Sequence, residues 1–210
     1  MTSYFDKRQG MVAGQIKARG VADSKVLQAM LKVQRHLFVP ENFMQEAYED
    51  YPLSIGFGQT ISQPYIVAYM IEAARLDAHD KVLEIGTGCG YQAAVLAEIV
   101  EEVYSIDVVR DLAESAKEKL RKLGYVNIHI YHRDGFQGLI EYAPFDAIIV
   151  SAAPAEVPQN LINQMKVGGR MVIPVGLFSQ ELYLITKQEK GVEQKRLLPV
   201  QFVPMVSGKL

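Results

Sequence analysis

The chain shows two patterns of apolar and polar positions, one before and one after about residue 80. In the first part, apolar residues recur every three or four positions, which predicts helices. Gly20 and Pro40 are stop signals, because glycine ends helices and the residue before proline avoids helical angles. The elements predicted there are a helix over about 11–20, a helix from 23 or 24 to a point before 40, a loop or short ribbon over 51–64, and a helix from 62 to about 76.

In the second part, short apolar runs alternate with helical patterns. The predicted strands are 81–86, 103–107, 127–135, 145–153, 170–176, 181–187 and 199–206, and the predicted helices are 91–100, 111–123 and 157–166. Such alternation indicates βαβ units and a parallel sheet covered on both faces. The last strands follow one another without a clear helix, which favours an antiparallel edge. We therefore predict one α/β domain over 1–210, with a doubly wound, mostly parallel, Rossmann-like core (61–210) and a helical N-terminal extension with a substrate loop (1–60).

Composition narrows the class of protein. The 210 residues include one cysteine, which excludes an intramolecular disulfide and disfavours a cysteine-rich zinc site. No signal peptide and no apolar run long enough for a membrane span is visible. A formal net charge of −2 disfavours non-specific nucleic-acid binding. We expect a cytoplasmic monomer with no metal, no nucleic acid and no membrane partner.

The loop after the strand 81–86 carries the first candidate chemistry. It reads Glu84-Ile85-Gly86-Thr87-Gly88-Cys89-Gly90-Tyr91, and its glycines allow a ligand to approach the backbone closely. The dinucleotide fingerprint G-x-G-x-x-G would need glycine at position 91, and no Gly-Lys-Ser/Thr follows as in a P-loop. An acid followed by G-x-G-x-G is instead typical of S-adenosylmethionine sites. The predicted cofactor residues in this loop are Glu84, Gly86, Thr87, Gly88 and Gly90.

Two further acids end the next two predicted strands. A carboxylate at Asp107, with Val108 beside it, can accept hydrogen bonds from both ribose hydroxyls. Asp134, followed by Gly135, can accept from the adenine amino group while a neighbouring backbone amide donates to the ring. The alternative is that Asp107 and Asp134 are helix caps or turn residues. The glycine loop favours the cofactor interpretation.

The residues at the end of the predicted strand 145–153 indicate which kind of chemical group accepts the methyl. Amine-methylating adenine and glutamine enzymes usually carry an Asn/Asp-Pro-Pro-aromatic segment there, whereas this chain has Ser151-Ala152-Ala153-Pro154. Methyl transfer depends mainly on positioning and electrostatics. A carboxylate, with a pKa of about 4, is already ionised and needs no base. The sequence therefore favours a carboxylate acceptor.

Several segments together closely resemble the protein-L-isoaspartate O-methyltransferases, a family of protein-repair carboxyl methyltransferases. They are 35–40 (RHLFVP), 58–64 (GQTISQP), the glycine loop extended through 91–94 (YQAA), 168–176 (GGR to PVG) and 202–205 (FVPM). The resemblance extends from about Gly10 to Val206. GQTISQP is its most specific part, because the general methyltransferase fold does not carry it.

The resemblance implies methyl transfer from S-adenosyl-L-methionine to the free carboxylate of an L-isoaspartyl residue in a damaged protein or peptide, and less efficiently of a D-aspartyl residue. The products are S-adenosyl-L-homocysteine and an ester, which collapses without the enzyme to a succinimide and hydrolyses partly to aspartate. The family's active-site serine corresponds to Ser62, whose hydroxyl would hold one carboxylate oxygen near a helix N-terminus that favours anions.

The resemblance also implies roles for the residues around Ser62. Those placed beside the cofactor are Gln59, Thr60 and Ile61. Those placed against the extended substrate backbone, in a β-augmentation mode, are Ile55, Gly56, Val203 and Pro204, with Ser62. The chain departs from the family at Cys89 (often serine), Asp107 (often glutamate), Ser151 (commonly threonine) and Tyr65 (frequently histidine). The shorter Asp107 would need a shifted backbone to contact ribose.

Other interpretations remain at this point. Ser62 alone would be an ordinary helix cap. The chain could methylate a small acid or another nucleophile, act as a nicotinamide oxidoreductase, or retain the fold as a non-catalytic module. Tyr91 weighs against the oxidoreductase, and the acids together with Ser62 weigh against the non-catalytic module.

Overall fold

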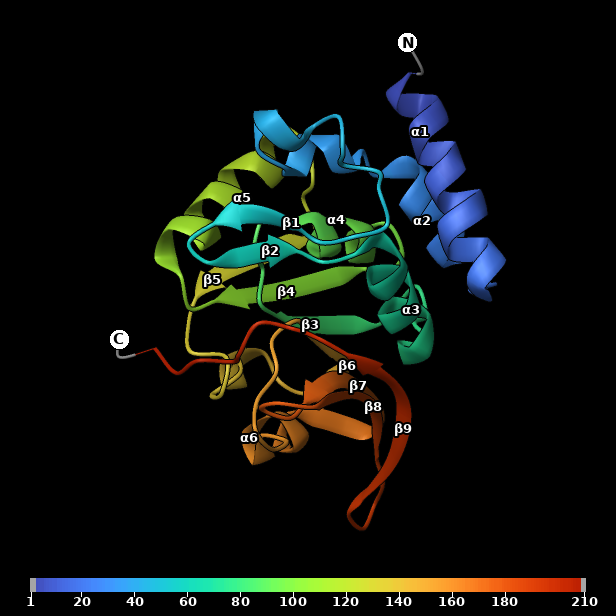
Figure 1. Ribbon diagram of the computed structural model, residues 1–210. Helices are drawn as coiled ribbons and strands as arrows, with labels where there is room; N and C mark the ends of the chain where they lie inside the picture. Colours follow the sequence, from blue (N-terminus) through green and yellow to red (C-terminus); the bar gives the residue numbers. More distant parts are fainter. Residues whose placement is uncertain (1–2, 209–210) are drawn as a thin grey trace.

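A single seven-stranded sheet forms the body of the protein, and a separate two-stranded hairpin lies beside it (Figure 1). The computed structural model describes residues 3–208. The strands are β1 (Leu53–Gly56), β2 (Gln59–Ile61), β3 (Lys81–Ile85), β4 (Glu102–Asp107), β5 (Ile128–His132), β6 (Phe145–Val150), β7 (Met165–Val175), β8 (Gln180–Lys187) and β9 (Val192–Val200). The α-helices are α1 (Tyr4–Gly10), α2 (Ser24–Lys32), α3 (Pro64–Ala74), α4 (Tyr91–Ala97), α5 (Arg110–Lys122) and α6 (Gln159–Asn163). A π-helical segment (Met11–Ile16) and short 3-10 segments (Lys17–Arg19, Arg35–Phe38, Glu41–Phe43 and Ile140–Tyr142) complete the elements.

The strand order is β5-β4-β3-β6-β7-β8-β9. Strands β3 to β7 pair in parallel, and β8 and β9 add to β7 antiparallel. The predicted doubly wound sheet with an antiparallel edge is therefore confirmed. The order reverses at β3, where β4 and β6 lie on opposite sides, and ligands bind at such a point beyond the carboxyl ends.

Two apolar cores lie on the two faces of the sheet. Val82 and Ile149 face the larger core, which α2 to α5 and the N-terminal segment cover. Leu83 and Ile148 face the smaller core, which packs against Leu161 of α6. The central strands β3 and β6 bury apolar side chains on both faces because both faces are covered, and Glu84 of β3 is the buried polar exception.

The N-terminal extension is attached to the residues that follow the glycine loop. The Arg35 side chain is fully buried, and its Nε donates a hydrogen bond to the Ala47 carbonyl at 2.7 Å. Its guanidinium carbon lies 4.9 Å from the ring centre of Tyr91, the first residue of α4, in a cation–π arrangement. The extension thus supports the base of the loop.

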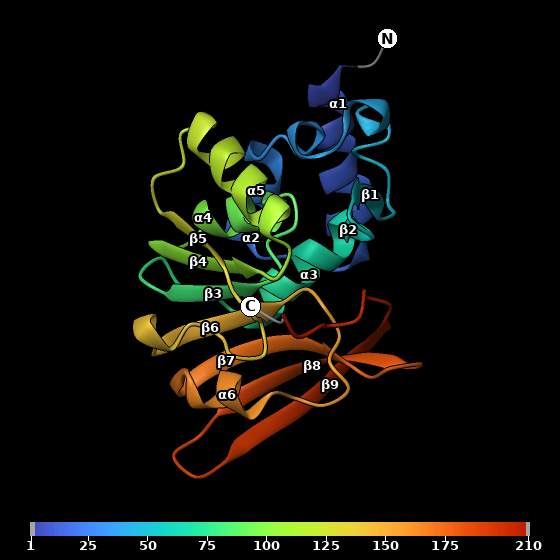
Figure 2. The ribbon, with the colours of Figure 1, turned by 90° about the vertical axis from the view of Figure 1, so that its left-hand side faces the viewer.

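Several predicted elements differ in extent. The helix predicted over about 11–20 is a π-helical and a 3-10 segment that continue α1 from Gly10 to Arg19, and the strand predicted over 170–176 begins earlier, at Met165. The predicted strand 199–206 is wrong, because β9 covers Val192–Val200 and the chain then leaves the sheet. Residues 201–206, here called the strap, cross the carboxyl end of the sheet on the side of the β1–β2 hairpin (Figure 2). The β9 strand escaped prediction because it is a charged, exposed edge strand without apolar alternation. The predicted helices ending before 40 and spanning 157–166 are shorter, since α2 ends at Lys32 and α6 covers Gln159–Asn163.

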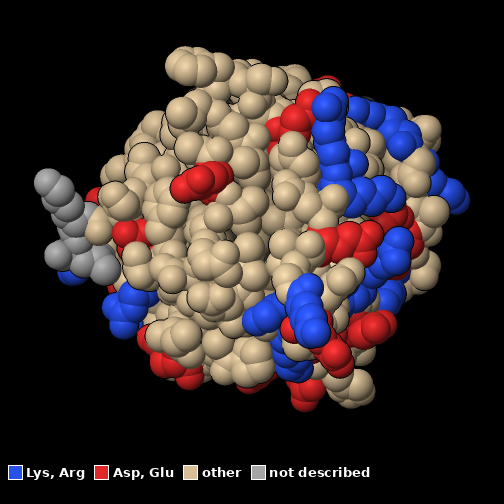
Figure 3. Space-filling model, turned by 90° about the horizontal axis from the view of Figure 1, so that it is seen from below, with Lys and Arg blue, Asp and Glu red and all other residues tan. Residues whose placement is uncertain are grey.

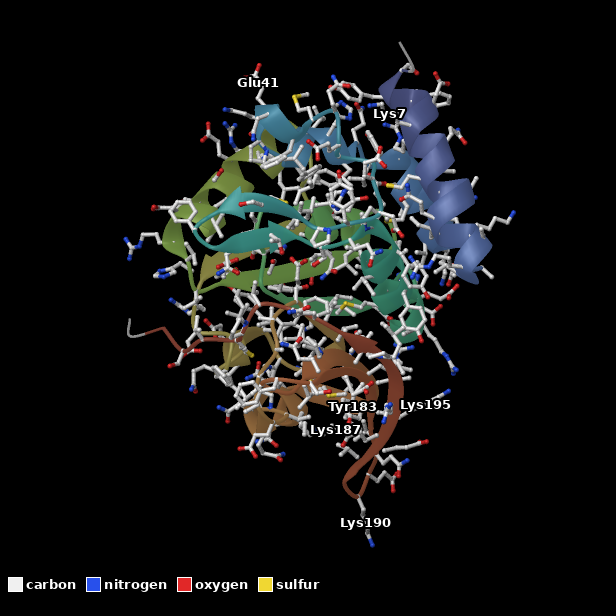
Figure 4. All side chains as sticks on the ribbon, viewed as in Figure 1. Lys7, Glu41, Tyr183, Lys187, Lys190 and Lys195 are labelled. Carbon is white, nitrogen blue, oxygen red and sulfur yellow. The ribbon has the colours of Figure 1, made fainter. Side chains whose placement is uncertain are left out.

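Charged side chains of both signs mix on the face seen in Figure 3, and much of that face carries few charges. Lys190 projects from the lower tip of the β8–β9 hairpin, away from the β1–β2 hairpin (Figure 4), whereas Lys187 bonds back to the Asn163 and Met165 carbonyls. No helix within residues 3–208 is long and apolar enough to cross a membrane.

Candidate active site

A cavity of about 770 Å³ opens at the carboxyl ends of the parallel strands. Its walls come from six segments far apart in sequence: the end of the β1–β2 hairpin with the start of α3, the glycine loop, the end of β4, the turn after β5, the residues after β6, and the strap with the last residues of β9. Sites of this size and position hold small-molecule ligands or cofactors.

The glycine loop brings backbone to the cavity wall. Gly86 and Gly88 line the cavity with φ angles of +94° and +53°, which side-chain-bearing residues rarely adopt. A Cβ atom on Gly86 would lie 3.4 Å from the Cβ atom of Ser151. Gly90 does not line the cavity; a Cβ there would lie 3.0 Å from Leu120 of α5. Gly90 therefore serves helix packing, and its predicted contact with the cofactor finds no support in this geometry.

Asp107, at the end of β4, lines the cavity with its carboxylate already oriented. Its Oδ2 accepts from the Gly88 N–H and its Oδ1 accepts from the Val109 N–H, both at 2.8 Å. Burial raises the pKa of the Asp107 carboxyl above its usual value, although these two N–H groups favour the charged form. Each oxygen retains a further lone pair for a hydroxyl donor. Val108 lies beside it in the wall.

Glu84 lies beneath the loop rather than at the cavity surface. Its side chain is fully buried and accepts a hydrogen bond from the Ser105 hydroxyl, which also bonds with the Thr87 hydroxyl at 2.6 Å. Burial, with a smaller contribution from the nearby Asp107 charge, raises the pKa of the Glu84 carboxyl to about 8, against the opposing hydrogen bond from Ser105. Glu84 therefore holds Thr87 and the loop in place through Ser105.

The turn after β5 places only one of its two predicted residues on the cavity. Gly135 lines it, whereas Asp134 is buried behind and its Oδ1 accepts from the Phe136 N–H at 2.9 Å. Asp134 is thus a turn-forming residue here. A Cβ on Gly135 would lie 2.6 Å from Ile85 and 2.9 Å from Met205, so only glycine permits this close approach of the strap.

Ser62 is half-buried and lines the same cavity. The interpretation of Ser62 as a helix cap is wrong, because α3 begins at Pro64, its N-cap is Gln63, and no side chain caps it. Gln63 instead donates to the Asp50 carbonyl at 2.8 Å. Ser62 therefore lies on the cavity wall just before the N-terminus of an 11-residue helix, outside the helix cap.

The β1–β2 hairpin contributes Gln59, Thr60 and Ile61 to the wall. Ile55 and Gly56 do not line the cavity, but Ile55 covers the glycine loop, with its Cδ1 3.2 Å from the Cβ position of Gly88. The tip lies within the loop or ribbon predicted over 51–64, but Phe57 was not singled out. Phe57 is 60% exposed with φ +54°, and a Phe-Gly pair in a turn where Asn-Gly is usual was the signal for it.

The strap contributes Val203 and Pro204. Its backbone is bonded to the residue after β6, because the Ala153 N–H donates to the Val203 carbonyl at 2.9 Å and the Met205 N–H donates to the Ala153 carbonyl at 2.8 Å. Sequence reasoning missed Gln92, which lines the cavity and donates to the Ser151 hydroxyl at 2.9 Å. A polar residue in the otherwise apolar first turns of α4 was the signal for it.

Within residues 3–208, no group of three His, Cys, Asp or Glu side chains is arranged to hold a metal ion.

Comparison with known proteins gives a consistent result. The family model described as protein-L-isoaspartate(D-aspartate) O-methyltransferase matches residues 6–210. A protein-L-isoaspartate O-methyltransferase from Picosynechococcus sp. is 56% identical, over 94% of this chain and 89% of the relative. One from Methanoculleus marisnigri is 52% identical, over 95% of this chain and 91% of the relative.

Solved structures agree. A protein-L-isoaspartate O-methyltransferase structure aligns with a TM-score of 0.87 and 31% identity over 94% of this chain, which spans 65% of that protein's length. A Plasmodium falciparum structure described as a protein-L-isoaspartate O-methyltransferase in complex with S-adenosyl-L-homocysteine aligns with a TM-score of 0.83 and 27% identity, over 98% of this chain and 99% of that one.

Proposed function

The chain belongs to the protein-L-isoaspartate(D-aspartate) O-methyltransferase family, and from that premise we propose how its residues perform the reaction. The enzyme uses S-adenosylmethionine to methylate isoaspartyl residues in damaged proteins. The finer steps are part of the proposal: the acceptor is the free carboxylate, D-aspartyl residues react more weakly, and the ester closes to a succinimide without help from the enzyme. The carrying observation is that Ser62, the glycine loop and the strap line one cavity.

The residues of the cavity fit the cofactor. The bare backbone at Gly86 and Gly88 allows close packing of a ligand that has no phosphate groups. The Asp107 oxygens, which the Gly88 and Val109 N–H groups orient, would accept from the two ribose hydroxyls, and the turn at Gly135 would hold the adenine. Glu84 supports this wall from below through Ser105.

When bound, S-adenosylmethionine supplies an electrophilic methyl group. Ser62 donates its hydroxyl proton in a hydrogen bond to one oxygen of the substrate carboxylate, which leaves the other oxygen free to attack. The N-terminus of α3 adds a favourable field for this anion. No proton needs to be removed, because the carboxylate is ionised near neutral pH. Ser62 therefore orients the nucleophile rather than activating it.

The substrate backbone runs between the hairpin tip and the strap. The strap is bonded to Ala153 along one side and to Gln180 at Phe202, which leaves the Pro204 carbonyl to accept a backbone hydrogen bond from the substrate. Backbone pairing suits an enzyme that accepts many sequences around one lesion.

The test uses S-adenosylmethionine with a labelled methyl group and two peptides that differ only in an isoaspartyl or a normal aspartyl linkage. We expect base-labile, volatile label with the isoaspartyl peptide alone. If neither peptide is labelled although the protein binds the cofactor in a separate measurement, the substrate is a small acid instead and the proposal is wrong.

A further inference from the structure

Two apolar side chains stand in solvent at the turn between β7 and β8. Leu177 is 67% exposed and Phe178 is fully exposed. The turn is held in place, because the Gly176 N–H donates to the Pro154 carbonyl at 2.9 Å. A Cβ on Gly176 would lie 2.0 Å from the Ser179 carbonyl oxygen, so the tight turn requires glycine. Single exposed apolar residues are ordinary, so their surroundings decide whether this pair has a role.

A second depression, of about 300 Å³, lies against this turn. It is lined by residues 177–180 on one side and by Pro199, Val200 and Gln201 on the other. The same three residues also line the main cavity. The depression therefore adjoins the active-site cavity across the end of β9.

The turn and the strap are joined by one side chain. Gln180 Nε2 donates to the Phe202 carbonyl at 3.0 Å, and the Phe202 N–H donates to Gln180 Oε1 at 2.6 Å. Phe202 itself lines the main cavity. A chain bound along the strap would thus meet the Leu177–Phe178 pair in a fixed position.

The electrostatic surroundings favour an apolar occupant. Glu181, next to Gln180, is paired with Arg196 at 3.0 Å. Lys187 lies at the opposite end of β8, and Figure 4 shows it and Lys190 far down the β8–β9 hairpin. No charged residue lines the depression, which offers the apolar side chains of Leu177, Phe178 and Val200 beside uncharged polar groups of Ser179, Gln180 and Gln201.

We propose that this depression, here called the flanking subsite, binds an apolar side chain of the substrate polypeptide near the isoaspartyl residue. The proposal rests on the function proposed above. The substrate is part of a polymer, so its chain must leave the cavity on either side of the reacting residue. Alternate side chains of an extended segment point to the same face, so a residue two positions away can enter the subsite while the isoaspartyl carboxylate is at Ser62.

The test compares isoaspartyl peptides that carry leucine or serine two positions before or after the lesion, with kcat/KM for methyl transfer as the readout. We expect the leucine peptide to be preferred by about 5- to 10-fold at one of these positions, the low end of hydrophobic discrimination because the subsite is open to solvent. In the double variant Leu177→Ser/Phe178→Ser, kcat/KM for the leucine peptide should fall to that of the serine peptide.

Ile140→Ser is the matched control, because Ile140 is 70% exposed and lines neither depression. It should retain the leucine preference. If the wild type shows no preference for the leucine peptide, or if the double variant keeps that preference, the subsite is wrong. Methylation of both peptides would still support the proposed function in either case. If the double variant instead abolishes a dimer seen by sedimentation and leaves the preference intact, the pair contacts a second copy and the subsite is wrong. No methylation of any isoaspartyl peptide would overturn the function and the subsite together.

Discussion

At the residue scale, Ser62 and Asp107 line one cavity but differ in how they are held. Asp107 is fixed by two backbone N–H groups, whereas no side chain caps the helix after Ser62. A fixed carboxylate suits a cofactor that must bind the same way every time. A hydroxyl outside the cap can rotate toward an incoming carboxylate.

We expect Ser62→Ala and Asp107→Ala to separate these two roles. Loss of a hydrogen bond to a charged group costs about 1.5–3 kcal/mol, so Ser62→Ala should lower turnover by about 10- to 100-fold and leave the Kd for S-adenosylmethionine nearly unchanged. Asp107→Ala should weaken cofactor binding first. Calorimetric titration and steady-state kinetics on both variants measure the difference.

Ser115→Ala is the control, because Ser115 is an exposed serine on α5. It should behave as the wild type in both measurements. Full turnover in Ser62→Ala would show that the hydroxyl does not orient the carboxylate.

At the element scale, the strap matters because it supplies one wall of the cavity without belonging to the sheet. The Gln180 amide holds it at Phe202, and Ala153 holds it at Val203 and Met205. We expect Gln180→Ala to loosen the strap by about 1–3 kcal/mol, the sum of two ordinary hydrogen bonds. The Phe202 amide should exchange faster with deuterium, and the KM for an isoaspartyl peptide should rise more than the Kd for the cofactor.

Gln188→Ala provides the comparison, because Gln188 bonds only to the exposed Glu193 side chain and to the β8–β9 turn. It should leave both measurements unchanged. If deuterium exchange of the Phe202 amide is unchanged in Gln180→Ala, the hydrogen bonds to Ala153 are sufficient to hold the strap.

The strap also shows where sequence reasoning works and where it fails. Strands β3 and β6 were predictable because burial on both faces demands continuous apolar residues. Residues 199–206 are apolar too, but local pattern does not reveal whether the partner is a strand or a cavity. Pro204, which has no N–H to donate, was the sign that this segment leaves the ladder.

Some residues of the candidate site could likewise be placed from the sequence, and others could not. Spacing along the chain placed Asp107 and the glycines at strand ends, where the topology must bring them together. The motif did not reveal which of its residues reach the cavity, because buried polar contacts and close packing are formed by residues far away in the sequence. Glu84 bonds to Ser105 beneath the loop, and Gly90 packs against Leu120, so neither lines the cavity.

At the scale of the whole molecule, Glu84 links the active-site wall to the stability of the fold. Its pKa is raised from an ordinary value of 4.5 to about 8 in the folded protein, chiefly by burial and further by Asp107, against the opposing bond from Ser105. Between these two values the folded state binds more protons than the unfolded state. The contribution of Glu84 to stability is therefore complete below about pH 4.5 and is lost as the pH rises through about 8.

We expect Glu84→Gln to remove this dependence, because glutamine carries the neutral shape at every pH. The free energy of unfolding is measured in urea for both proteins. The wild-type value minus the variant value should fall by a few kcal/mol between about pH 5 and about pH 9. Glu118→Gln is the control with the opposite sign, since the hydrogen bond from Lys122 lowers the pKa of the Glu118 carboxyl and any stability it adds is lost as the pH falls. Glu118 is exposed, so solvent screening keeps that effect small. A wild type and a Glu84→Gln variant with parallel pH profiles would mean that Glu84 is ionised beneath the loop, and Thr87 would then be held by a charged rather than a neutral partner.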